Sequence, residues 1–172
     1  YIFLLDDVFD NLEDVVAGNF NTAVKEYPGG KYKATRELNA LCDNLKEVGK
    51  EIFTLADAGS SGDLSARAKA DNFHGDWNRM LVGLNNLVEA FVVPLTESIN
   101  VLTGISQGQL SSRVEGEYDG EFLVLKESLN NTASTLNGYV GEISRVVGEL
   151  ANSNLNIGVD IDFVGDFKAI QD

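Results

Sequence analysis

The chain has 172 residues, with 13 lysines and arginines against 27 aspartates and glutamates, and a formal net charge of -14. Nucleic acids and anionic membrane surfaces are also negative, so neither is an expected partner. Cys42 is the single cysteine, which excludes a disulfide within the chain and a cysteine-rich zinc site and favours a reducing compartment. Length alone does not set the number of domains, which must come from the pattern.

The sequence predicts no membrane span inside the chain. No uninterrupted apolar run reaches the ~20 residues that a span needs, and the apolar start at 1–5 is followed directly by Asp6 and Asp7. Because the chain begins without Met and stops at Asp172 inside a periodic segment, we expect it to be a piece of a longer protein. Any membrane segment is expected outside it.

One motif, a glycine between two aromatic residues, divides the chain. It occurs at 73–77, 118–122 and 163–167, and in a weaker form at 28–32, where Tyr27 stands one place early. A fixed period of this length indicates a repeated structural unit, and a coiled coil with accidental glycines would not produce it. The central glycines, spaced by 45 residues, are Gly30, Gly75, Gly120 and Gly165.

Two further features recur in the same order. A glycine two residues before an apolar residue precedes each aromatic motif, at 18–20, 62–64 and 108–110, with a serine variant at 153–155. A Leu-Asn pair follows three of the four motifs, at 38–39, 84–85 and 129–130. The repeats are therefore 1–47, 48–92, 93–138 and a truncated 139–172, with boundaries that are arbitrary by several residues.

Long helices are expected between the motifs. Apolar residues step by three and four from Trp77 to Ile105 and again from Phe122 to Leu150. This spacing is a heptad seam, typical of helices packed in a bundle. Each helix would have roughly 30 residues and a length near 45 Å.

A connector of about ten residues, such as 108–120, separates successive helices. Helical period is lost there, and Gly108 can adopt the left-handed conformation that ends a helix. An acidic residue opens the next helix in three repeats, where the helix dipole favours it; Lys31 breaks this rule in the first. Two apolar residues four apart are expected to pin each connector to the bundle, namely Phe20 with Val24, Leu64 with Ala68, Leu110 with Val114 and Leu155 with Val159.

These residues resemble the HAMP domain, a linker of histidine kinases, adenylate cyclases, methyl-accepting chemotaxis proteins and some phosphatases. The third repeat is the most specific match, because Pro94 stands fourteen residues before Gly108 as the family pattern asks. The glycine-acidic-aromatic start of the second helix departs from the usual Asp-Glu-x-Gly and is similar to divergent units strung together in chemotaxis receptors. The resemblance gives relay or structural roles to Pro94, Gly108, Leu110, Val114, Gly120, Glu121, Phe122, Leu129, Asn130, Gly75, Asp76, Trp77, Gly165, Asp166 and Phe167.

The resemblance implies an all-α fold in which two parallel copies of the chain form a coiled coil of stacked four-helix HAMP-like bundles with extended connectors. It implies a signal relay on the cytoplasmic side of an inner-membrane-anchored receptor, most simply a chemotaxis transducer. The partners would be a second copy of the chain, an upstream sensor or transmembrane segment, and a downstream output domain. A passive spacer, a histidine kinase linker and a ligand-binding sensory module remain alternatives.

No pattern indicates catalysis, a metal or a cofactor. His74 is the single histidine and is expected in a solvated loop. The acidic stretch 57–76 lacks the ligand spacing of an EF-hand, and 28–31 lacks the order of a phosphate-binding loop. The repeated aromatics Tyr32, Trp77, Phe122 and Phe167 are expected to be core plugs, and Pro94 a bend in its helix.

Overall fold

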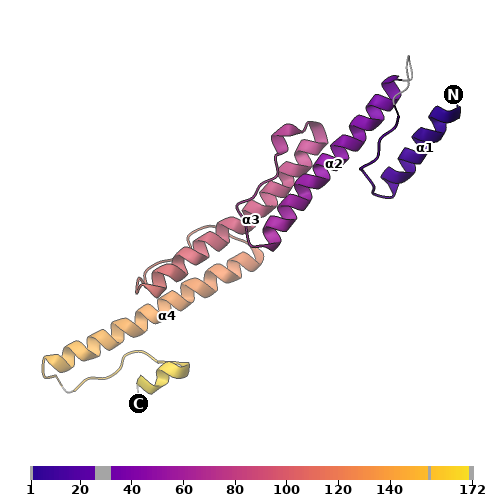
Figure 1. The fold of residues 1–172 in the computed structure, drawn as a ribbon. Helices are drawn as coiled ribbons and strands as arrows, with labels where there is room; N and C mark the ends of the chain where they lie inside the picture. The colour runs from indigo at the N-terminus through magenta and orange to yellow at the C-terminus, as the bar shows by residue number, and fades with distance from the viewer. Residues whose placement is uncertain (1, 26–31, 155, 171–172) are drawn as a thin grey trace. The chain divides into compact units, whose positions relative to one another are not determined.

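The computed structural model describes residues 2–25, 32–154 and 156–170 (Figure 1). These residues form an all-α structure, and no strand occurs among them. The α-helices are α1 (Ile2–Val16), α2 (Tyr32–Ser60), α3 (Gly75–Ser106) and α4 (Gly120–Ala151), and the short 3-10 helices are η2 (Ala70–Asn72) and η3 (Gly165–Ile170).

The three long helices have the lengths that the seams predict. Helix α2 has 29 residues, and α3 and α4 have 32 each. Helices α3 and α4 begin at Gly75 and Gly120, the central glycines of the aromatic motifs. Tyr27, Gly30 and Lys31 of the first motif lie outside the described residues.

Four helices end in the same hydrogen-bonded turn. At the end of α3, Gly108 N donates to Ile105 O at 2.9 Å and Gln109 N to Gly104 O at 2.8 Å, the two bonds of a Schellman motif. The residue at the Gly108 position must take a positive φ, which glycine does without strain. This residue is Gly18, Gly62, Gly108 or Ser153 in the four turns, with φ of 85°, 85°, 80° and 64°.

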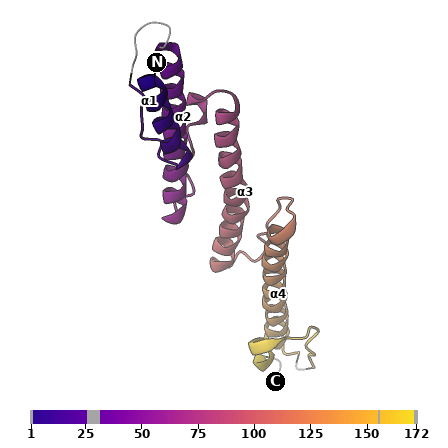
Figure 2. The ribbon, with the colours of Figure 1, turned by 90° about the vertical axis from the view of Figure 1, so that its right-hand side faces the viewer.

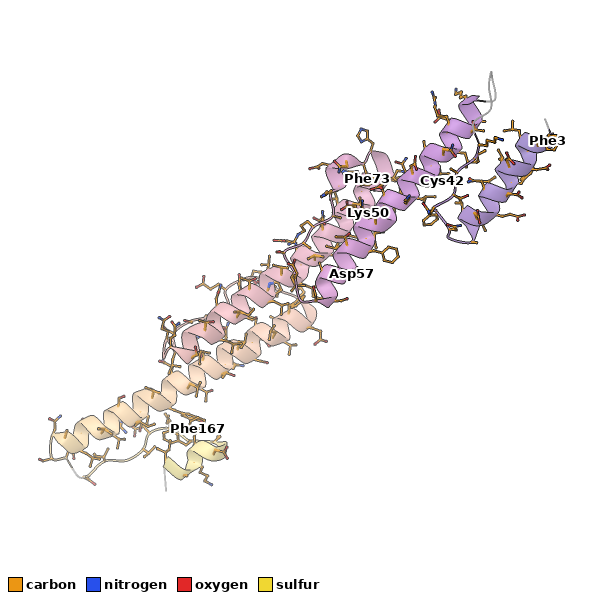
Figure 3. The ribbon with its side chains drawn as sticks, in the orientation of Figure 1. Phe3, Cys42, Lys50, Asp57, Phe73 and Phe167 are labelled. Atoms are coloured by element: carbon orange, nitrogen blue, oxygen red, sulfur yellow. The ribbon has the colours of Figure 1, made fainter. Side chains whose placement is uncertain are left out.

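The chain divides into two compact units, residues 1–89 and 90–172, with the boundary inside α3. In the first unit, α1 lies beside α2 (Figure 2). Cys42 is on the side of α2 toward α1 (Figure 3), and its Sγ donates to Asn11 Oδ1 at 3.5 Å. The core of this unit is Val48, Ala68, Ala70 and Leu81, with Phe73, Trp77 and Leu84 packed against it.

The second unit has two aromatic clusters. Phe91 of α3 meets Phe122 of α4 edge to face, with ring centroids 5.6 Å apart. Tyr139 of α4 packs on Phe163 and Phe167, with centroids at 4.7 and 4.9 Å. These contacts hold α3 to the start of α4, and the end of the chain to the middle of α4.

Helix α3 bears on the expected absence of a membrane span. By length and composition it is the one described helix that could, with a mean hydropathy of 1.3 and 22% of the apolar window buried. Its polar residues nevertheless have specific partners: Asn85 bonds Ala68, and Glu97 accepts from Gly116 N. A helix that packs against neighbours on more than one side has the same apolar character.

Candidate functional site

The connectors are the segments in which the repeats agree most closely. The second apolar pin is buried in three of them, with Val24, Ala68 and Val114 exposed by 4, 6 and 3%. The first pin is less covered, since Phe20 and Leu110 are half-buried and Leu64 is exposed. The fourth connector differs from the expectation, because Val159 is 38% exposed and Leu155 lies outside the described residues.

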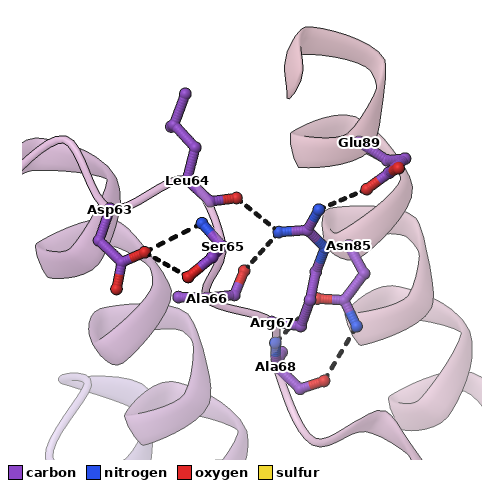
Figure 4. Close-up of polar contacts among 8 residues, drawn as sticks. All are labelled: Asp63, Leu64, Ser65, Ala66, Arg67, Ala68, Asn85 and Glu89. Carbon is purple, nitrogen blue, oxygen red and sulfur yellow. Dashed lines mark hydrogen bonds and ion pairs between the residues drawn. The ribbon is translucent and has the colours of Figure 1, made fainter. Parts of the chain in front are cut away.

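An asparagine side chain of the second helix forms hydrogen bonds with the backbone of each buried pin residue. Asn85 Nδ2 donates to Ala68 O at 2.9 Å, and its Oδ1 accepts from Ala68 N at 2.8 Å (Figure 4). We call this pair of bonds the asparagine clasp. It recurs with Asn39 on Val24, at 2.7 and 2.9 Å, and with Asn130 on Val114, at 2.9 and 3.1 Å.

The clasp solves a problem that burial creates. A connector outside helix and sheet has no backbone partner for its N–H and C=O, and leaving such groups buried and unpaired is costly. A side-chain amide carries one acceptor oxygen and a donor NH2, so a single asparagine satisfies both groups of one residue. The Leu-Asn pair marked the position in the sequence, but its role became evident only from the contacts.

A glutamate of the first helix bonds the backbone of the second, third and fourth connectors. Glu51 accepts from Lys69 N at 2.8 Å, Glu97 from Gly116 N at 3.1 Å, and Glu142 from Asp160 N at 2.7 Å. These glutamates stand 46 and 45 residues apart, the period of the repeat. The sequence analysis did not single them out, although the period could have found them.

An arginine braces two of the connectors. Arg67 Nη1 donates to Leu64 O at 2.7 Å and to Ala66 O at 2.8 Å, while Nη2 pairs with Glu89 of α3 (Figure 4). Arg113 repeats the arrangement on the carbonyls of Leu110 and Ser112, and donates to Ser134 Oγ of α4 at 3.0 Å. Each arginine therefore joins its connector to the second helix of its repeat.

The fourth repeat replaces this brace with a charged network on α4. Arg145 donates to Glu142 at 2.9 and 2.6 Å, to Gly158 O at 2.7 Å, and pairs with Asp160 at 3.2 Å. The bonds from Arg145 and from Asp160 N lower the pKa of Glu142 to about 2, and Glu142 raises the pKa of Arg145. Tyr139 also accepts from Val164 N at 3.0 Å through its hydroxyl.

The second helices begin with the expected acidic residues. The aromatic residue that follows the glycine is not the expected core residue in every repeat. Asp76, Glu121 and Asp166 lie in the first turns of α3, α4 and η3. Gly75, Gly120 and Gly165 take φ of 60°, 57° and 60°. Trp77 and Phe122 are half-buried and Phe167 is 41% exposed, so the last is no core plug in one chain. The side chain of Tyr32 lies outside the described part.

In the fourth repeat the aromatic residue before the glycine lies deeper than the one after it, and in the second repeat both pack on the core. Phe163 is 4% exposed, and Phe73 packs on the core of the first unit. In the fourth repeat the buried aromatic is therefore Phe163, which packs on Tyr139, and not the following aromatic that the sequence analysis expected as the core plug. The repeat marks both aromatic positions in the sequence, and only the packing in the structure shows which of the two is more buried.

Pro94 and Leu129 occupy helix positions within the second unit. Pro94 is buried inside α3, which continues through it, and Ser98 Oγ donates to Pro94 O at 2.7 Å. Leu129 is half-buried beside Asn130. The proline therefore packs within a continuous helix.

Other candidate sites offer little chemistry. Among the described residues no group of three or more His, Cys, Asp or Glu could hold a metal ion. Burial raises the pKa of the Cys42 thiol, which lowers its reactivity. A hollow of about 450 Å³ beside the third connector is lined mainly by polar side chains, Glu97, Asn100 and Arg113 among them. The connector contacts are the most specific arrangement on the described surface.

Comparison with known proteins identifies this arrangement. Residues 72–138 match the HAMP domain family, a range that contains α3, the third connector and α4 as far as Gly138. Over 94 residues the chain is 33% identical to the methyl-accepting chemotaxis protein McpB of Pseudomonas aeruginosa. That match covers 55% of this chain and 14% of the relative, so the chain corresponds to a small part of such a receptor. Residues 72–138 are therefore similar to HAMP domains, and part of the chain is similar to a methyl-accepting chemotaxis protein.

Proposed function

We propose that the chain is a tandem array of HAMP-like modules that relays a signal within a chemotaxis-type receptor. The modules are 1–47, 48–92, 93–138 and the truncated 139–172, and each passes a change in helix packing to the next. The observation that carries the proposal is the asparagine clasp, which occurs in the matched HAMP domain and again in the first connector on Val24. A region of this kind typically takes part in signalling without catalysis, and the proposal assigns no cofactor.

Uncovered seams support a second copy of the chain as the partner. Seam residues of α3 and α4 remain about half exposed or more in one chain, which is a large apolar surface for a monomer to leave in water. Two helices cannot bury both of their seams alone, whereas two parallel copies would complete a four-helix bundle in each module. The exposed seam residues are Phe91, Ile99, Leu102, Val140, Val147 and Leu150.

The placement follows from the same comparisons. HAMP regions of chemotaxis receptors typically lie on the cytoplasmic side of the membrane, so the proposal places the chain between an upstream sensor or transmembrane segment and a downstream output domain. A histidine kinase would use the same modules with a different output. A passive spacer would need only a stable rod. The buried asparagine clasps instead favour a module in which the connector is fixed to the second helix at a defined position.

An insertion experiment in the intact parent receptor tests the relay. The insertion point is after Leu136, between Ser134, which contacts the third connector, and Tyr139, which contacts the fourth. Seven inserted residues keep the heptad phase and lengthen the helix by roughly 10 Å, whereas four change the phase of everything downstream. We expect output to stay regulated with seven residues and to become locked or inverted with four.

The measurement is receptor output with and without stimulus in both insertion variants. The seven-residue variant is the matched control, because it carries the larger insertion but conserves phase. A normal response with four residues would show that helix phase carries no signal, and the passive spacer would then replace the relay.

A further inference from the structure

We infer that Glu51, Glu97 and Glu142 are positioning residues of the relay, each tying its connector to the first helix of its module. The inference rests on the proposed function and adds to it a specific mechanical element. In the second and third modules the asparagine clasp ties the same connector to the second helix. The connector is therefore bonded to both helices, and we call the glutamate bond the first-helix tie.

The two attachments in one module lie within two residues of each other. In the third module, Asn130 of α4 grips Val114 and Glu97 of α3 bonds Gly116. In the second module, the gripped residue Ala68 and the tied residue Lys69 are neighbours. So short a piece of extended chain cannot absorb a displacement between its two attachments by changing its own path.

This geometry couples axial movement of the two helices. A shift of one helix by a single residue is about 1.5 Å, and along the bond, with the Glu97 rotamer unchanged, it would stretch the bond from 3.1 Å beyond hydrogen-bonding distance. The helices must then move together with the connector, or the tie must break. A tie that holds makes the module respond as a unit, and this is what a relay through successive modules requires.

The choice of glutamate fits a tie that faces only donors. An ionised carboxylate accepts and never donates, and its bonds to N–H groups are shorter and stronger than neutral ones. The clasp needs a donor as well as an acceptor, so it takes asparagine. The residue types at the two positions therefore match the backbone groups that each one meets.

The modules differ in how firmly the glutamate is held. In the fourth, Arg145 stands one helical turn after Glu142 and bonds both of its carboxylate oxygens, at 2.6 and 2.9 Å. The corresponding residues are Thr54 in the second module and Asn100 in the third, and neither side chain carries a charge. The Glu142 carboxylate is therefore the most firmly held of the three.

Amide hydrogen exchange on the 172-residue chain tests the tie directly. We expect Glu97→Ala to speed exchange of the Gly116 amide at least tenfold while the Val114 amide, held by Asn130, changes much less. Glu97→Gln keeps an acceptor oxygen and should restore most of the protection. Thr96→Ala, at the adjacent exposed position of α3, is the matched control and should leave both amides unchanged.

The outcomes separate the tie from the relay. If Gly116 exchanges alike in Glu97→Ala and Thr96→Ala, the tie is wrong whatever the receptor does. If Glu97→Ala does not fold, Glu51→Ala takes its place and should speed exchange of the Lys69 amide several-fold; an unchanged Lys69 would likewise overturn the inference.

The positioning role has a separate readout in the intact receptor. We expect Glu97→Ala to alter the ratio of output with and without stimulus, and Glu97→Gln to restore it. A faster Gly116 exchange with an unaltered ratio would reduce the tie to a structural bond and reject its role in positioning. The insertion after Leu136 would remain the test of the relay itself.

Discussion

Val114 combines two interactions that reinforce each other. Its side chain is 3% exposed, and its N–H and C=O are both bonded to Asn130. Burial of the side chain removes water from the backbone, which makes the two hydrogen bonds necessary, and the bonds in turn fix the side chain in place. The same combination recurs at Val24 and Ala68, so one residue per connector anchors the segment.

Val114→Asp should destabilise the fold by about 3 kcal/mol or more, because it removes apolar burial and places an unpaired charge beside α4. Ser111→Asp, in the same connector but exposed, should stay within about 0.5 kcal/mol of the native chain. Urea unfolding followed by circular dichroism measures both. Equal losses of stability would show that the connector is not anchored at Val114.

Glu142 gives the fourth module a defined response to acid. Its pKa falls from an ordinary value of 4.5 to about 2 because Arg145 and Asp160 N bond the carboxylate. The stabilisation is therefore complete above about pH 4.5 and is lost as the pH falls through about 2. The Tm difference between the native chain and Glu142→Gln should shrink across this range, and Arg145→Gln should remove the same pH dependence. A constant Tm difference would contradict the assignment.

The asparagines show how much of a residue's role can be predicted from a single sequence. Their recurrence after leucine marked Asn85 and Asn130 as part of the repeat, but a period says where a residue stands and not which atoms it meets. Glu97 was missed for a related reason. In an acidic chain a glutamate on a helix is ordinarily a solvated charge, and only the nearby Gly116 N–H gives this one a role.

The elements themselves could be predicted because local signals agree with one another. Heptad seams predicted α3 and α4, and glycines marked where both helices begin and where α3 ends. Residues 165–170 are an instructive difference: the same motif that opens α3 and α4 opens only a six-residue 3-10 helix.

The helix ends favour glycine at one position of the repeat, and three of the four described ends have it. Gly108→Ala puts a Cβ on a residue with φ of 80° and should destabilise by about 1 kcal/mol. Ser153 has φ of 64° at the equivalent position of α4. Ser153→Gly relieves that strain but loosens the unfolded chain, so it should be neutral or slightly stabilising. Thermal unfolding checks both, and a stabilising Gly108→Ala would refute the argument.

Charge and apolar surface act in opposite directions at the scale of the whole molecule. Seam residues such as Ile99, 60% exposed, favour association. A net charge of -14 on each chain opposes it, because two copies bring like charges together. The repeat predicted the order of helices and connectors, whereas the number of chains in a bundle depends on how much seam one chain leaves uncovered. The uncovered seam surface depends on how the chain folds, so the sequence repeat alone does not predict it.

A parallel homodimer is therefore expected, and its stability should rise with salt. Screening weakens the repulsion between the two acidic chains while leaving seam burial in place, so the dimer should tighten between about 50 and 500 mM NaCl. Sedimentation equilibrium at micromolar concentration should give about twice the 18.6 kDa of one chain. Ile99→Lys, in the exposed seam, should shift the chain toward monomer, whereas Asn100→Lys, at the adjacent exposed position, should not. A fully helical, compact monomer at all salt concentrations would mean that the seams are covered in some other way, and the four-helix bundle would have to be abandoned.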